Sequence, residues 1–144
     1  MDATISPYLI VIALGWIAAQ GLKYVFTVIK TKKIWNFRQF YTSGNMPSSH
    51  TACVIGLATV IGLIDGVDSA LFGIAFLFAM IVMYDAVMVR RSSGEQGIAI
   101  QELIKRGKAN IVLPRAAKGH TPLEVLAGAL LGGLLGIVVF VATK

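Results

Sequence analysis

The sequence predicts an all-α integral membrane protein, a bundle of about four transmembrane helices with one more helix lying at the membrane interface. Of its 144 residues, 56% are hydrophobic, and the mean hydropathy is +0.77. Several apolar runs approach the roughly 20 residues that a helix needs to cross a bilayer core of about 30 Å. A spanning backbone must satisfy its own hydrogen bonds, which excludes an open sheet. We expect residues 1–144 to form a single membrane-embedded domain.

The first span is expected over residues 8–29, entered by Pro7, whose missing N–H costs little at a helix start. The chain begins without the positive region of a signal peptide, so this segment is expected to remain a membrane helix. Lys23 interrupts its last third, and two interpretations stay open. The lysine extends its stem along the helix towards the interface, or it is a buried functional residue.

A basic segment with interspersed aromatic residues follows the first span, over residues 30–46. Cations mixed with aromatic side chains are typical of a loop at the level of the lipid headgroups. The same cations suit phosphate, which a guanidinium binds through two hydrogen bonds and an ammonium binds as a point charge. Lys32, Lys33 and Arg38 are therefore interfacial anchors or candidate phosphate ligands.

The next two spans are expected over residues 49–64 and 69–89, joined by a tight turn at Gly66 into an antiparallel hairpin. Asp85 lies near the end of the third span, where an unpaired carboxylate is costly. An ion pair between Asp85 and a nearby arginine or lysine is therefore favoured over the alternative, a catalytic role for Asp85.

After the polar residues 90–96, an amphipathic pattern that runs to about residue 106 predicts a short helix lying at the interface. It should start at a capping box within residues 92–96 and end at Gly107. Arg90 and Arg91 precede it, and they are either cytoplasmic anchors of the third span or candidate phosphate ligands.

The last span is expected over residues 122–142 and carries Gly128, Gly132 and Gly136 at four-residue spacing. Such a ridge lets another helix approach closely. The partner is either a helix of the same chain or a second copy, which makes a homo-oligomer through these glycines a candidate assembly.

The net charge of +6 is concentrated between the apolar runs, without a pattern suited to base stacking. This distribution favours membrane lipids and an anionic substrate as partners and argues against nucleic acid. Because cytoplasmic loops are enriched in lysine and arginine, we expect both termini outside and both histidine-containing loops cytoplasmic, in the cell (plasma) membrane.

His50 and His120 are the two histidines of the chain, and each stands where an apolar helix is about to begin. With several guanidiniums expected nearby, they suit phosphoryl transfer through a histidine intermediate, which needs a nucleophile, an acid and donors for the phosphoryl oxygens. Helix N-termini would add backbone N–H groups. Two histidines and one cysteine make a poor metal-ligand set, so we expect no metal and no other cofactor.

At residues 44–52, 84–96 and 119–128 the sequence resembles the type 2 phosphatidic acid phosphatase superfamily, which includes vanadium haloperoxidases. It is most similar to the superfamily's small divergent bacterial and plant branch, over nearly the whole chain. Pro47-Ser48-Ser49-His50 resembles the motif Pro-Ser-Gly-His. This implies that His50 is the general acid and that Ser48 and nearby N–H groups hold phosphate, while Ser49 replaces the motif glycine and offers a hydroxyl.

His120 followed by Glu124 resembles the ending His-x-x-x-Asp of the last motif. The resemblance implies that His120 is the nucleophile and that Glu124 is the carboxylate that orients it. Glu124 also completes a capping box with Thr121, which by itself explains a glutamate at this position.

Two motifs of the superfamily are incomplete in this chain. In the first, Lys-x-x-x-x-x-x-Arg-Pro, Thr31 stands at the lysine position and Gln39 follows Arg38. A Leu-Pro pair stands where the last motif has Ser-Arg, and Arg90 and Arg91 are candidates to replace it.

The hypothesis that follows is a metal-independent membrane phosphatase that hydrolyses a lipid phosphate or an isoprenoid (polyprenyl) diphosphate through a phosphohistidine. The alternative is a catalytically inactive phosphatase-like protein that binds anionic lipid or serves as a subunit of a membrane assembly. A transporter built around Asp85 and Lys23 is a third interpretation, for which four short spans leave little room.

Overall fold

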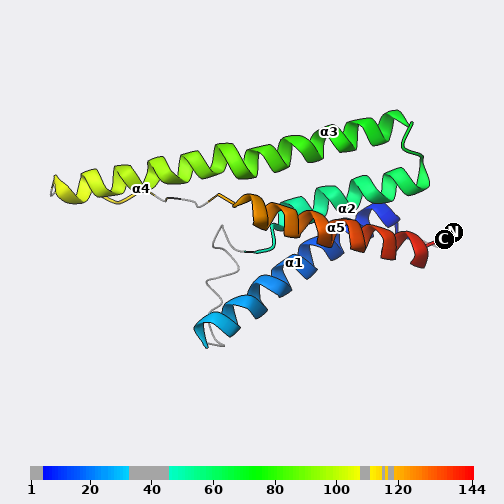
Figure 1. The fold of residues 1–144 in the computed structure, drawn as a ribbon, viewed down its shortest axis with the longest axis horizontal. Helices are drawn as coiled ribbons and strands as arrows, with labels where there is room; N and C mark the ends of the chain where they lie inside the picture. Colours follow the sequence, from blue (N-terminus) through cyan, green and yellow to red (C-terminus); the bar gives the residue numbers. More distant parts are fainter. Residues whose placement is uncertain (1–4, 33–45, 108–110, 115, 117–118) are drawn as a thin grey trace.

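The computed structural model describes residues 5–32, 46–107, 111–114, 116 and 119–144, and every regular element in this part is helical (Figure 1). The helices are α1 (Pro7–Thr31), α2 (Ser49–Ile64), α3 (Ala70–Tyr84), the π-helical turn η2 (Asp85–Val89), α4 (Arg90–Arg106) and α5 (Pro122–Ala142). The helical membrane bundle predicted from the sequence is confirmed.

Three helices of the described part are long and apolar enough to cross a membrane: α1, the continuous helix Ala70–Arg106, and α5. Helix α2 is also apolar, but its 16 residues reach only about 24 Å at 1.5 Å per residue. The four predicted spans therefore correspond to three full-length helices and one apolar helix shorter than a bilayer core.

The helices begin where the sequence supplies local capping groups. Pro7 occupies the first turn of α1, the Ser48 hydroxyl accepts from the N–H of Thr51 at the start of α2, and Thr121 caps α5. The turn between α2 and α3 needs Gly66, whose φ is +89° and lies in the left-handed region that suits glycine.

The helices of the bundle run in alternating directions, so different helix ends meet at each end of the bundle (Figure 1). Val11, Val60 and Val139 form a buried cluster near the start of α1 and the ends of α2 and α5, and the hydroxyl of Tyr8 donates to Asp65 at 2.7 Å beside them. Helices α1 and α3 therefore run away from this end and α2 and α5 run towards it. The N-termini of α2 and α5 consequently meet at the opposite end.

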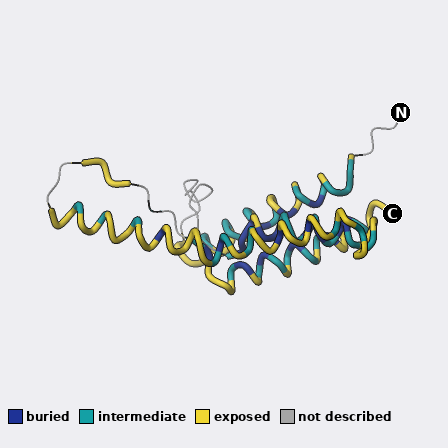
Figure 2. Tube along the Cα trace, turned by 90° about the horizontal axis from the view of Figure 1, so that it is seen from above, coloured by how far each residue is buried: buried dark blue, intermediate teal, exposed yellow. Residues whose placement is uncertain are grey.

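Helices α2 and α5 make the most extensive contact among the described helices, through small residues that are buried between them. Figure 2 shows the buried residues gathered where the helices of the bundle lie together, whereas the projecting helix is mostly exposed. A Cβ added at Gly128 would lie 2.5 Å from the Ser48 carbonyl oxygen, and one at Gly136 would lie 2.7 Å from Thr59 Cβ. At Gly132 it would overlap the carbonyl oxygen of Ala52. The glycine ridge therefore packs within the chain, and a homo-oligomer through it stays a prediction.

The predicted break between the third span and a separate interfacial helix is wrong, because α3, η2 and α4 form one helix that projects beyond the bundle (Figure 1). The expected capping box is not formed, since Val89 at the start of α4 has no side-chain cap. Instead, Asp85 pairs with Arg90 across the junction of η2 and α4, and within the first turns of α4 Arg91 pairs with Glu95 and Ser92 with Gln96. No proline interrupts this stretch, so the helix continues to its predicted end at Gly107.

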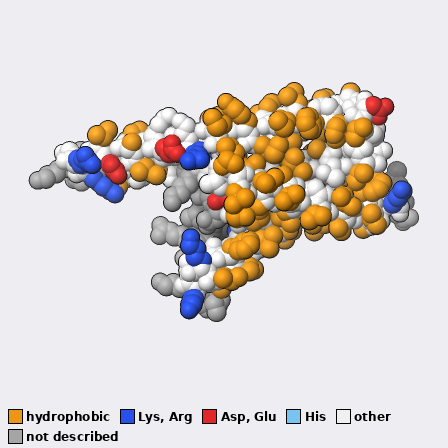
Figure 3. All heavy atoms as spheres, in the orientation of Figure 1, with side chains coloured by type: hydrophobic (Ala, Val, Ile, Leu, Met, Phe, Trp, Pro, Cys, Tyr) orange, Lys and Arg blue, Asp and Glu red, His pale blue; other side chains and the backbone are white. Residues whose placement is uncertain are grey.

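The outer surface of the bundle is apolar. Figure 3 shows hydrophobic side chains over most of the visible face, with lysine and arginine gathered mainly towards the end where α4 projects. Phe76 and Leu130, for example, are 52% and 63% exposed. Contiguous apolar surface of this extent fits contact with lipid chains, and the protein is an integral membrane protein.

Candidate functional site

His120 is held at the start of α5 by its backbone. Its N–H donates to the carbonyl oxygen of Ala86 in η2 at 3.0 Å, and the residue is only 7% exposed. Gly119 lies so close to the backbone of Arg91 that a Cβ there would overlap it. The π-helical turn and the glycine together fix where His120 sits.

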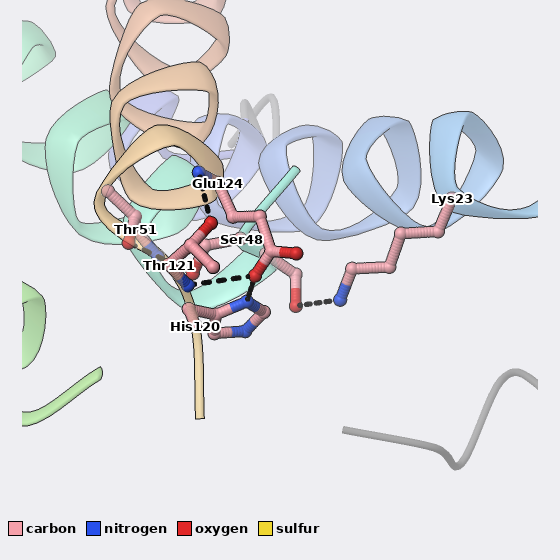
Figure 4. Close-up of polar contacts among 7 residues, drawn as sticks. Lys23, Ser48, Thr51, His120, Thr121 and Glu124 are labelled. Atoms are coloured by element: carbon pink, nitrogen blue, oxygen red, sulfur yellow. Dashed lines mark hydrogen bonds and ion pairs between the residues drawn. The ribbon is translucent and has the colours of Figure 1, made fainter. Parts of the chain in front are cut away.

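Glu124 makes both contacts that the sequence left open, one with the imidazole of His120 and one with the start of α5. Its Oε2 lies 3.0 Å from His120 Nδ1 and also accepts the N–H of Thr121 at 3.0 Å, while its own N–H donates to the Thr121 hydroxyl (Figure 4). One carboxylate therefore completes the capping box and contacts the imidazole. A carboxylate can only accept, so Nδ1 carries a hydrogen, and in the neutral imidazole Nε2 then keeps its lone pair.

The charge state of His120 follows from its surroundings. Burial lowers the pKa of His120 below its ordinary value, the hydrogen bond to Glu124 opposes this, and the positive charges of Lys23 and Arg90 lower the pKa further. The net effect is a lowered pKa, so the imidazole is neutral at pH 7.

The start of α2 is tied directly to the start of α5. The backbone N–H of Ser48 donates to the carbonyl oxygen of Glu124 at 3.0 Å. The Ser48 side chain is fully buried, and its hydroxyl accepts from the hydroxyl of Thr51 at 3.0 Å. The two histidine motifs, which are 70 positions apart in the sequence, are therefore adjacent in the fold.

His50 follows Ser49 in the first turn of α2 and is exposed. The charges of Arg90, Lys23, His120 and Asp85 all act on it. The two histidines therefore belong to one electrostatic neighbourhood, with His120 buried and His50 open to the surroundings.

Lys23 is also at this site, although it was not among the predicted site residues and only the possibility of a functional role was left open. Its ammonium donates to the hydroxyl of Ser49 at 3.4 Å, and Figure 4 shows the side chain reaching from α1 towards His120 and Glu124. The sequence signal was a lysine inside an otherwise apolar span, a position where a charge is costly unless it has a use.

Arg90 and Arg91 lie at the same end of the bundle, and each is paired with a carboxylate. Arg90 binds Asp85, which is the ion pair expected for that aspartate, and Arg91 lies 3.2 Å from Glu95. Arg91 also lines a cavity of about 240 Å³ together with Gly119, His120 and Thr121. At least one arginine therefore shares an accessible space with the imidazole.

The remaining predicted phosphate ligands lie elsewhere or outside the described residues. Lys32 ends α1 in a left-handed conformation (φ 54°) and is exposed. Nine residues at 1.5 Å each put it about 14 Å beyond Lys23 along the helix axis. Lys33 and Arg38 fall in the part of the chain that the structure does not describe.

Comparison with known proteins assigns the chain to a family. The sequence profile of the "Divergent PAP2 family" matches residues 5–135, which include both histidine motifs. The chain belongs to the divergent PAP2 family. A relative, the "Uncharacterized membrane protein YuiD" of Bacillus subtilis (strain 168), is 37% identical over 138 residues, which cover 85% of this chain and 86% of the relative. No solved structure matches the chain.

In this divergent PAP2 protein the described site combines groups that suit phosphoryl chemistry. A neutral imidazole presents Nε2, a carboxylate holds Nδ1, and cationic side chains from α1 and α4 surround the two histidines. The N-termini of α2 and α5 meet at the same place and add the positive ends of two helix dipoles. Such a site can attract an anion and offer it a nucleophile.

Proposed function

We propose that the protein is a membrane phosphatase that hydrolyses a lipid phosphate or an isoprenoid diphosphate through a phosphohistidine. The observation that carries the proposal is the hydrogen bond between His120 Nδ1 and Glu124 Oε2 beside the Ser48–His50 segment. This pair orients a nucleophilic nitrogen at the junction of two helix N-termini, in a protein that belongs to the divergent PAP2 family.

In the first step, the lone pair on His120 Nε2 attacks phosphorus and the bond from phosphorus to the leaving oxygen breaks. His50, in its protonated form, gives a proton to that oxygen. Glu124 stabilises the positive charge that develops on the imidazole, since it accepts the Nδ1 hydrogen. A water molecule then attacks the phosphohistidine with His50 as base, which releases inorganic phosphate and restores His120.

The phosphoryl oxygens would be held by donors around the imidazole. Ser49 offers its hydroxyl and Arg91 its guanidinium, while Arg90 adds positive charge near both histidines. The side chain of Ser48 is buried and caps α2, so in this segment backbone N–H groups beside Ser48 would bind the phosphate. Lys32, Lys33 and Arg38 remain candidates for contacts with the headgroup.

A lipid substrate is favoured by the apolar surface that adjoins the site. A groove of about 490 Å³ runs between the end of α3, η2 and the first turns of α5, and Met80, Tyr84, Pro122 and Leu126 are among its lining residues. Pro122 follows His120 by two positions, so a hydrocarbon chain and a phosphate group of one molecule can lie on adjoining surfaces.

The test is release of inorganic phosphate by the purified protein in lipid, from phosphatidic acid and from polyprenyl monophosphates and diphosphates. Because burial lowers the pKa of His120, the imidazole stays neutral as the pH falls to about 6.5, the ordinary pKa of histidine. The rate should therefore decline only at lower pH. Absence of turnover with every substrate, or an acid limb well above pH 6.5, would contradict the proposal.

The inactive alternative also has an observation in its favour, since both arginines beside the site are engaged by carboxylates. Such a protein would bind anionic lipid without hydrolysing it, or serve as a subunit of a membrane assembly. Saturable binding of phosphatidic acid without phosphate release in the same preparation would select this function.

We also propose that the site faces the cytoplasm from the plasma membrane. Described basic residues at the site end are Lys30, Lys32, Arg90, Arg91, Lys105 and Arg106, whereas Asp65 and Asp68 lie at the other end with Lys144. In a Cys53→Ala background, an impermeant maleimide should label Lys144→Cys on intact cells and Lys105→Cys only after permeabilisation. The reverse pattern would invert the topology.

A further inference from the structure

The ammonium of Lys23 connects groups from three helices. The Lys23 side chain extends from α1, and its ammonium donates to Ser49 in the first turn of α2 (Figure 4). The charge of this ammonium also acts on His120 and Glu124 at the start of α5. It also acts on His50. The ammonium therefore lies among the starts of α2 and α5, where its charge acts on both histidines.

Interfacial anchoring does not explain this placement. Lys30 and Lys32 are exposed near the end of α1 and suffice as anchors, whereas Lys23 is about 14 Å before Lys32 along the axis and is partly buried. Among the described residues, no ion pair includes Lys23. A partly buried ammonium without a direct counter-charge gains strongly from an anion that reaches it.

We propose that Lys23 is a phosphate ligand of this site, holding a phosphoryl group between the hydroxyl of Ser49 and the imidazole of His120. An ammonium has three donors, and Ser49 uses one of them, so two remain for phosphoryl oxygens. As charge builds on those oxygens during attack by His120, the same contact would strengthen. The inference rests on the proposed function for the attack, but phosphate binding can be measured without turnover.

The probe is inorganic phosphate, added to the full-length protein in detergent while the thermal unfolding midpoint is followed. Lys23→Met keeps a stem of similar length and removes the charge, and Lys30→Met is the matched control on the exposed part of the same helix. The phosphate concentration for half of the midpoint shift should rise about tenfold or more in Lys23→Met, the loss expected for one charge-assisted hydrogen bond. It should be unchanged in Lys30→Met.

A change of fold is separated from a change of binding by two further variants. Lys23→Arg keeps the charge and should retain part of the phosphate affinity, whereas Lys23→Gln keeps a donor without the charge and should lose it. Equal phosphate affinity in the parent, Lys23→Met and Lys23→Gln would overturn the inference, and so would a parent protein that shows no phosphate-dependent shift.

The outcomes also distinguish this inference from the proposed function. Phosphate binding that depends on Lys23, in a protein that releases no phosphate from any lipid, would support the inference and reject the phosphatase. Phosphate release with kcat and KM unchanged in Lys23→Met would support the phosphatase and reject Lys23 as a phosphate ligand.

Discussion

Replacing His120 by asparagine should lower the rate of phosphate release by about 10⁴-fold or more, because in the proposed mechanism His120 Nε2 forms the bond to phosphorus. The variant should fold, because the hydrogen bonds from residue 120 to Ala86 and from Ser48 to Glu124 join backbone atoms and do not involve the side chain that is replaced. The measurement is single-turnover phosphate release in lipid, together with retention of label on the protein from a ³²P-labelled substrate. The label should be acid-labile in the parent and absent in the variant.

His50→Asn is the informative comparison. Loss of a general acid typically costs about 10²- to 10⁴-fold, so this variant should be slower than the parent and should still acquire label on His120. Thr121→Ser keeps a hydroxyl at the cap of α5 and should remain close to parent activity. Parent-level turnover in His120→Asn would rule out the phosphohistidine.

Gly132→Ala should destabilise the fold by about 3 kcal/mol, because the added methyl group overlaps the backbone of α2. The ideal Cβ lies 3.0 Å from both the carbonyl carbon and the Cα of Ala52 and closer still to its carbonyl oxygen. A buried helix backbone cannot yield as a flexible side chain does, so α2 and α5 would have to separate. Their separation would also displace Ser49 and His50 from His120.

Gly133→Ala is the matched control, because it makes the same change one position along α5 and its Cβ meets nothing within 4 Å. Both variants gain the same intrinsic helix propensity, so the difference between them measures the contact with α2. Unfolding of each protein in detergent, followed by far-ultraviolet circular dichroism, gives the two free energies. Equal stability of the pair would show that the close approach of α2 and α5 does not hold the bundle together.

Much of the helical organisation could be predicted because its causes are local. The bounds of α2 and α5 agree with the predicted residues 49–64 and 122–142, since a serine or threonine cap and a following apolar run act over one or two turns. The predicted break before residue 92 was wrong because it also relied on a local capping pattern. A capping pattern was present, but side-chain pairs at the junction and in the first turns of α4 and the absence of proline kept the helix continuous.

The candidate site depended on the tertiary structure to a larger degree. The sequence singled out the two histidine motifs, but the contact between them comes from the hydrogen bond of Ser48 to Glu124 and from the glycines that let α2 and α5 approach. Glu124 makes the contacts of both alternative interpretations, because one carboxylate oxygen accepts from the helix start and from the imidazole.

What the sequence determined by itself was an apolar helical chain with two polar motifs at helix starts, because composition and capping are local properties. What only the tertiary structure decided was which cation stands beside those motifs. The sequence around Lys23 is compatible with a side chain that points to the interface and with one that points to the site. The direction depends on how α1 is rotated against its neighbours, which the local sequence does not determine. In the structure, Gly15 packs closely against the backbone of Ala52, and α1 is rotated so that the ammonium of Lys23 reaches Ser49.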